Sequence, residues 1–144
     1  MKRLIAGIMV GMILSQPLQT EARAPDPVEV TYEEAQELMQ ITSAEALNQG
    51  EKGMLYVMSV VINRVSSPEF PNNIHDVIHQ PHQFATKGME SAEITPEVHK
   101  ALADLECGNL RSGIIGFEKK NGKKLDEYFQ ESFTYLDHIF YESK

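Results

Sequence analysis

The sequence is poor in the residues and motifs that most often bring chemistry to a protein. It contains no tryptophan and a single cysteine, Cys107, among 144 residues. It has no CxxC pair, HExxH motif, Walker-type loop or GxGxxG motif, so we expect no metal and no other cofactor. One cysteine allows no internal disulfide. We expect Cys107 to be a small buried residue rather than a nucleophile, because free cysteines are usually buried and inert.

Long hydrophobic runs are also missing. The apolar run over residues 4–14 is too short to span a bilayer. It follows the basic residues 2–3 and precedes a small-x-small cleavage pattern at residues 22–24. Residues 1–24 are therefore predicted to be a signal peptide, with an uncleaved signal anchor as the alternative. This predicts export to the periplasm, the cell wall or the medium, without stable membrane insertion after cleavage.

Positive charge is scarce as well. Removing residues 1–24 takes away three basic residues and one acidic residue, which leaves 10 basic and 20 acidic residues and a net charge of −10. Binding to nucleic acid depends on neutralising phosphates with lysine and arginine, so no nucleic-acid partner is expected. The remainder is long enough for one domain but not comfortably for two. We expect an arm at residues 25–30 and one domain over residues 31–144.

The first clear helix signal is a capping box at residues 31–34, Thr-Tyr-Glu-Glu, which predicts a helix to about Leu47. Apolar and small residues at helical spacing form a predicted buried stripe of Ala35, Leu38, Met39, Thr42 and Ala46. Glu45 falls at the edge of this stripe. A carboxyl group that is partly removed from water suits a general acid, although a capping role or a pair with Lys52 is the alternative.

A second helix is predicted from Met54 to Val65, after a glycine-containing turn at residues 48–53. Its apolar residues continue almost all round, so it should be the central buried helix. Tyr56, Ser59 and Asn63 share its one polar side. That row is expected either to line a cleft facing Glu45 or to satisfy neighbouring backbone groups.

The remaining elements are shorter. Helices are predicted at residues 74–79, and at residues 96–106 with Thr95 as N-cap. Residues 114–117 and 135–141 are predicted strands. The basic turn at residues 119–124 carries a hairpin signal, and it either contacts anionic groups or is simply solvated.

Three histidines near the short helix, His75, His79 and His82, raise the question of a metal site. No fourth ligand has a suitable spacing, and Pro81 interrupts the helical register. No metal is therefore predicted here.

Several short motifs occur in a fixed order between residue 44 and the carboxyl terminus. They are Ala44-Glu45-Ala46, Gly53, Asn63-Arg64-Val65, Phe70-Pro71, Gln80-Pro81, Gln83-Phe84 and His138-Ile139-Phe140-Tyr141. Together they resemble the SleB/CwlJ-type cell wall hydrolases, the spore cortex-lytic enzyme family. That family has A-E-A-R-G-E-x-x-x-G-Q, N-R-V, P-x-F-P, Q-P-x-Q-F and H-x-F-Y in this order.

The resemblance implies an α+β, mainly helical, lysozyme-like domain with a small β element. It implies a lytic transglycosylase whose partner is the peptidoglycan glycan strand, with Glu45 as the single acid/base. The bond cleaved would be the β-1,4 bond between N-acetylmuramic acid and N-acetylglucosamine. Motif position alone suggests that Asn63, Gln83, Tyr56 and Tyr141 bind the sugar. Protein partners are unknown.

The chain departs from the family pattern at Leu47-Asn48-Gln49, where relatives have R-G-E, and at Ala85-Thr86. Without tryptophan, any sugar stacking must fall to tyrosine or phenylalanine. A hydrolytic muramidase is one alternative, and a catalytically weak peptidoglycan-binding accessory protein is another. Glu51 and Asp76 are further acids, each beside a turn, and neither is a convincing partner for Glu45.

Overall fold

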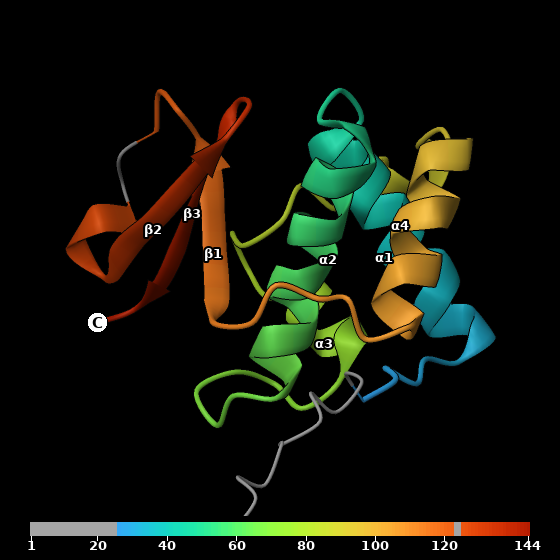
Figure 1. Cartoon of the computed structure of the whole chain (residues 1–144), viewed down its shortest axis with the longest axis horizontal. Helices are drawn as coiled ribbons and strands as arrows, with labels where there is room; N and C mark the ends of the chain where they lie inside the picture. Colours follow the sequence, from blue (N-terminus) through green and yellow to red (C-terminus); the bar gives the residue numbers. More distant parts are fainter. Residues whose placement is uncertain (1–25, 123–124) are drawn as a thin grey trace, which may run out of the picture.

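A computed structural model describes residues 26–122 and 125–144. The predicted signal peptide lies outside these residues. The described elements are α1 (Tyr32–Ala46), α2 (Gly50–Val65), α3 (Ile74–Ile78), η1 (Met89–Ser91), α4 (Pro96–Glu106), β1 (Ile114–Lys119), η2 (Leu125–Glu127), β2 (Phe129–Tyr135) and β3 (His138–Ser143). Figure 1 shows the sheet on one side of α2, and α1 and α4 on its opposite side. The predicted α+β, mainly helical class is confirmed.

Helix α1 begins where the sequence predicts. The Thr31 hydroxyl accepts from the Glu34 amide, and the Glu34 carboxylate accepts from the Thr31 amide, which completes the capping box. Most of the predicted stripe is buried, although Ala35 is only half-buried. Ile41 and Ser43 are buried as well, so the packed face of α1 is broader than predicted.

Helix α2 is the central helix, as predicted, and it contacts α1, α3, α4 and β1. It begins at Gly50, four residues earlier than expected. Gly50 has a φ of +68°, which favours glycine, so it serves as the turn while the helix already starts. Gly53 is therefore a helical residue. A Cβ there would meet Gln49 Cβ at 2.5 Å and the Tyr135 ring at 3.3 Å, so only glycine allows this close approach.

Helices α3 and α4 both begin at capped residues, and the cap of α4 is the predicted Thr95. The Asn73 side chain accepts from the Asp76 amide, and the Thr95 side chain accepts from the Val98 amide. Helix α4 covers the predicted residues and ends at the C-cap Cys107. Cys107 is exposed, so the prediction of a buried cysteine is wrong. Its position on the solvent side of the last turn of α4 explains this.

The three strands form an antiparallel sheet in the order β1-β3-β2. The predicted strand over residues 135–141 is confirmed for residues 138–141, which belong to β3, but its start is wrong, because a two-residue turn at Leu136-Asp137 separates β2 from β3. Leu136 has a φ of +47°, which ends the extended run. The basic turn after β1 does form, with the Gly122 amide donating to the Lys119 carbonyl. It does not join paired strands, because β1 pairs with β3.

The predicted arm is attached to the domain. The Val28 amide donates to the Glu106 carbonyl at 3.2 Å, and Val28 and Val30 pack against the main core. That core lies among α1, α2, α3 and α4, and a smaller cluster of Val60, Ile114 and Phe140 joins α2 to the sheet. No helix in residues 26–122 or 125–144 has the length and apolar character needed to cross a membrane.

Candidate active site

Glu45 lies in the last turn of α1, half-buried. The backbone amide of Ala85 donates to its Oε1 at 2.6 Å. Ala85 belongs to the loop that follows α3, so this bond joins the end of α1 to a segment 40 residues away. A hydrogen bond from the backbone holds the carboxyl group in one place, which is a requirement for a positioned acid or base.

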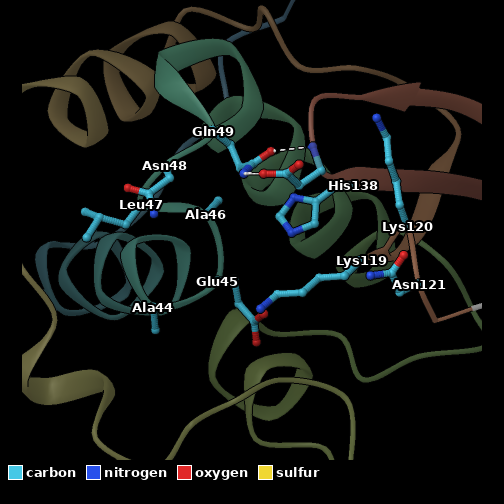
Figure 2. A pocket seen from close by; sticks show the side chains of 11 residues that line it. Ala44, Glu45, Ala46, Leu47, Asn48, Gln49, Lys119, Lys120, Asn121 and His138 are labelled. Carbon is cyan, nitrogen blue, oxygen red and sulfur yellow. Dashed lines mark hydrogen bonds between the residues drawn. The ribbon is translucent and has the colours of Figure 1, made fainter.

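Glu45 lines a pocket of about 470 Å³. Figure 2 shows the pocket between the end of α1, the turn into α2, the basic turn after β1 and the β2–β3 turn. Three separate segments of the chain, residues 44–49, 119–121 and 137–138, therefore build it. The lining residues are Ala44, Glu45, Ala46, Leu47, Asn48, Gln49, Lys119, Lys120, Asn121, Asp137 and His138.

The positive charge of the pocket comes from its lysines. Lys119 extends from the end of β1 toward Glu45 (Figure 2). His138 is 2% exposed, and its Nδ1 has no hydrogen-bond partner. Burial lowers the pKa of His138, the charge of Lys119 lowers it further, and Asp137 opposes the change. Burial therefore favours the neutral form of His138, and its unpaired Nδ1 is itself buried behind the pocket surface.

Gln49 fastens two walls of the pocket together. Its amide donates to Asp137 Oδ2 at 3.2 Å, and the Asp137 backbone amide donates to Gln49 Oε1 at 3.0 Å. Gln49 is 5% exposed, whereas its partner Asp137 is exposed, so both bonds are partly shielded from water. The turn into α2 is thus held against the β2–β3 turn, at one of the residues where this chain departs from the family pattern.

Replacing Gln49 with alanine is expected to lower the free energy of unfolding by about 1–3 kcal/mol, because it removes two hydrogen bonds that each contribute about 0.5–1.5 kcal/mol. Urea unfolding measures the difference. Asn48→Ala is the matched control, because Asn48 is the exposed neighbour in the same turn. Equal stability of the two variants would show that the paired bonds do not hold the turns together.

The polar row on α2 faces β1 and the loop before it, not Glu45. The Asn63 side chain donates to the carbonyls of Arg111 and Ile114, both at 2.8 Å. The Ser59 hydroxyl donates to the Leu55 carbonyl and accepts from the Arg111 amide. Tyr56 packs edge-on against three aromatic rings of the sheet. The row therefore does not line a cleft facing Glu45. Asn63 and Ser59 instead satisfy neighbouring backbone groups, which was the alternative expectation, and Tyr56 packs against the sheet.

The other two residues suggested for sugar binding also lie outside the pocket that Glu45 lines. Gln83 is exposed, and its Oε1 accepts from Arg64 at 3.0 Å. Tyr141 is fully buried, and its hydroxyl donates to Glu118 and Asp126. Burial raises the pKa of the Tyr141 phenol well above its usual range, and the two carboxylates add to the effect. The structure gives both side chains internal contacts.

Sequence reasoning assigned neither Asp137 nor His138 to the site, although His138 opens the closing H-x-F-Y motif. For the basic turn, which contributes Lys119, Lys120 and Asn121 to the pocket, it left contact with anionic groups and simple solvation as alternatives. Glu51 and Asp76 do not line this pocket, and Asp76 accepts from the Asn73 side chain at the start of α3.

Comparison with known proteins gives a family and two related structures. A family described as cell wall hydrolase matches residues 48–141, beginning three residues after Glu45. The catalytic domain of the germination-specific lytic transglycosylase SleB from Bacillus anthracis has a TM-score of 0.71 at 22% identity, covering 81% of this chain and 99% of that one. The catalytic domain of Bacillus cereus SleB has a TM-score of 0.65 at 20% identity, covering 85% and 99%. No curated protein matches significantly. The two structures share this fold.

Proposed function

The chain belongs to the cell wall hydrolase family and is thus an enzyme that acts on peptidoglycan, and from this premise we propose that it is a lytic transglycosylase. It cleaves the β-1,4 bond between N-acetylmuramic acid and N-acetylglucosamine. Glu45 is its acid and base. Export to the cell envelope, where peptidoglycan lies, is part of the same proposal.

The proposal rests on the number of carboxyl groups that line the pocket. Among its lining residues, only Glu45 and Asp137 carry one. Asp137 is committed to Gln49 in the pocket wall. One carboxyl group thus remains for chemistry. A glycosidase that uses water or a covalent intermediate needs two carboxyl groups across the bond, so one available group favours an intramolecular nucleophile.

The reaction needs no second acid. Glu45 in its protonated form gives its proton to the glycosidic oxygen, and the bond from that oxygen to C1 of the muramic acid breaks. The 6-hydroxyl of the same muramic acid then attacks C1 while Glu45 takes up the hydroxyl proton. The products are a free 4-hydroxyl on the glucosamine and a 1,6-anhydromuramic end. No water is consumed, and Glu45 returns to its starting state.

The pocket walls suggest how the glycan strand is held. Lys119 and Lys120 both line the pocket, and the Lys119 side chain extends toward Glu45, in a chain that is otherwise acidic. We assign them to the carboxylates of the peptidoglycan stem peptide. The expected stacking on tyrosine or phenylalanine has no counterpart here, because neither type lines the described part of this pocket. Leu47, 43% exposed, supplies the apolar contact instead.

Mass spectrometry of digested peptidoglycan tests the reaction type. We expect muropeptides with anhydromuramic ends, each lighter by one water than the hydrolysis product. Reducing ends would overturn the transglycosylase assignment and favour a muramidase. Absence of any soluble product, with binding to the insoluble glycan retained, would favour the accessory-protein alternative.

A further inference from the structure

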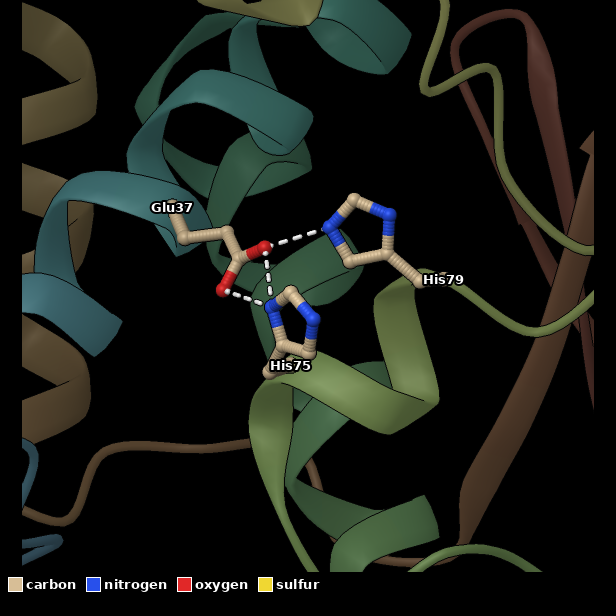
Figure 3. A group of neighbouring side chains, drawn as sticks. All are labelled: Glu37, His75 and His79. Carbon is tan, nitrogen blue, oxygen red and sulfur yellow. Dashed lines mark hydrogen bonds and ion pairs between the residues drawn. The ribbon is translucent and has the colours of Figure 1, made fainter.

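A second group of side chains lies apart from the pocket of Glu45. Figure 3 shows Glu37 on α1 facing His75 and His79, which belong to α3 and its C-cap. His75 Nδ1 lies 2.9 Å from Glu37 Oε1 and 3.2 Å from Oε2, and His79 Nε2 lies 2.5 Å from Oε1. Two imidazole nitrogens thus point at one carboxylate.

The geometry of these donor atoms is close to that of a metal site. One ligand atom from each residue can be chosen so that all three lie within 4.8 Å of one another. Around a tetrahedral zinc ion with bonds of about 2.0–2.1 Å, ligand atoms lie roughly 3.3 Å apart. The two distances from His75 are near this value. The shorter His79 contact widens to it by a small movement, which the 40% exposed His79 side chain allows.

We propose that Glu37, His75 and His79 bind one divalent transition-metal ion of the zinc class, with water completing the coordination. Imidazole nitrogen combined with a carboxylate suits this class of ion better than calcium or magnesium, which prefer oxygen ligands alone. Two histidines four residues apart present their rings on one side of a helical turn. Glu37 is 18% exposed, so its carboxylate is partly shielded from competing water.

The sequence predicts no metal because the ligands are far apart in the chain. The apparent third histidine, His82, lies outside the group, and Glu37 supplies the carboxylate from 38 residues before His75. The periodicity of α1 alone does not show which acid faces α3. Only the packing of α1 against α3 brings the three residues together.

The proposed ion is a brace between two helices. His79 caps α3, and the chain then runs directly to Ala85, whose amide binds Glu45. Glu37 and Glu45 are eight residues apart, about 12 Å along α1. None of the three ligands lines the Glu45 pocket. The ion therefore stabilises the frame of the site and takes no part in bond cleavage.

The test uses the purified chain, treated with EDTA and then freed of the chelator. Calorimetric titration with zinc chloride is expected to show one equivalent bound, with a dissociation constant in the micromolar range or below. Saturating zinc should raise the Tm by roughly 5 °C, because a ligand that binds only the folded state stabilises it. Absence of saturable binding to the folded protein would overturn the proposal.

Matched variants assign the site. Glu37→Gln and His79→Gln are expected to weaken zinc binding at least tenfold, whereas His82→Gln and His99→Gln leave it unchanged. Unchanged affinity in both ligand variants would overturn the assignment. If the ligand variants fail to fold, the histidine ring resonances of the unmodified protein decide. Zinc should shift those of His75 and His79 and leave those of His82 and His99 in place, and the opposite pattern would overturn the proposal.

Discussion

Replacing Glu45 with glutamine is expected to slow peptidoglycan cleavage by about 10³-fold, because positioned general acid–base catalysis contributes effects of this size. Glutamine has nearly the same shape and keeps a carbonyl oxygen to accept from the Ala85 amide, which lies 2.6 Å from Glu45 Oε1. It has no proton to give to the glycosidic oxygen. Release of soluble muropeptides from purified peptidoglycan measures the loss.

The control is the same substitution at another half-buried glutamate. Glu51 lies in the first turn of α2 and does not line the pocket, so Glu51→Gln should retain the wild-type rate. Circular dichroism should show both variants folded. Wild-type activity in Glu45→Gln would remove Glu45 from the mechanism. Loss of activity in Asp137→Asn, with Glu45→Gln still active, would transfer the role of acid to the β2–β3 turn.

Most of the individual helices could be predicted from the sequence, because the signals that start a helix lie within a few residues of one another. The capping box at Thr31 and Glu34 fixes the start of α1, and Thr95 with Pro96 fixes that of α4. The apolar residues of α2, which continue almost all round the helix, correctly predict that it is the central helix. The family resemblance, carried by ordered motifs, is confirmed by the match over residues 48–141.

The pocket could not be predicted in the same way, because three segments that are distant in the sequence form it. Asn63 was a candidate for sugar binding, yet this residue and the other motif residues Gly53 and Arg64 hold helices, loops and strands together. They therefore identify the fold more directly than the chemistry. The β2–β3 turn was not predicted, because Leu136 adopts a positive φ and the residues around it are of types that favour strands.

Arg64 shows most clearly how such a motif residue supports the site, and Arg64→Lys is expected to lower the free energy of unfolding by about 3 kcal/mol. The side chain is 4% exposed. Its Nε donates to the Ile115 carbonyl at 2.6 Å, and its Nη1 donates to Gln83 Oε1 at 3.0 Å. The guanidinium also lies 4.8 Å from the ring centre of Phe70 and 5.3 Å from that of Phe84.

Lysine cannot replace these contacts. Burial lowers the pKa of Arg64 to about 10, so the group remains charged at neutral pH although water is excluded. A flat guanidinium can donate in two directions while it lies near two aromatic rings, whereas an ammonium group is compact and strongly hydrated. The substitution therefore leaves the Ile115 carbonyl or Gln83 without its donor. No carboxylate within residues 26–122 and 125–144 forms an ion pair with Arg64 to compensate.

The effect should reach catalysis through one short segment. Gln83 precedes Ala85 by two residues, so releasing Gln83 loosens the amide that holds Glu45. We expect Arg64→Lys to lower the cleavage rate at temperatures where the protein stays folded. Arg111→Lys is the matched control, because Arg111 is exposed and its guanidinium lies 5.1 Å from the ring centre of Phe133. That change should cost only about 0.5–1 kcal/mol. Urea unfolding measures the loss of stability, and muropeptide release measures the loss of rate. Equal losses in the two variants would show that the buried position of Arg64 confers no special role.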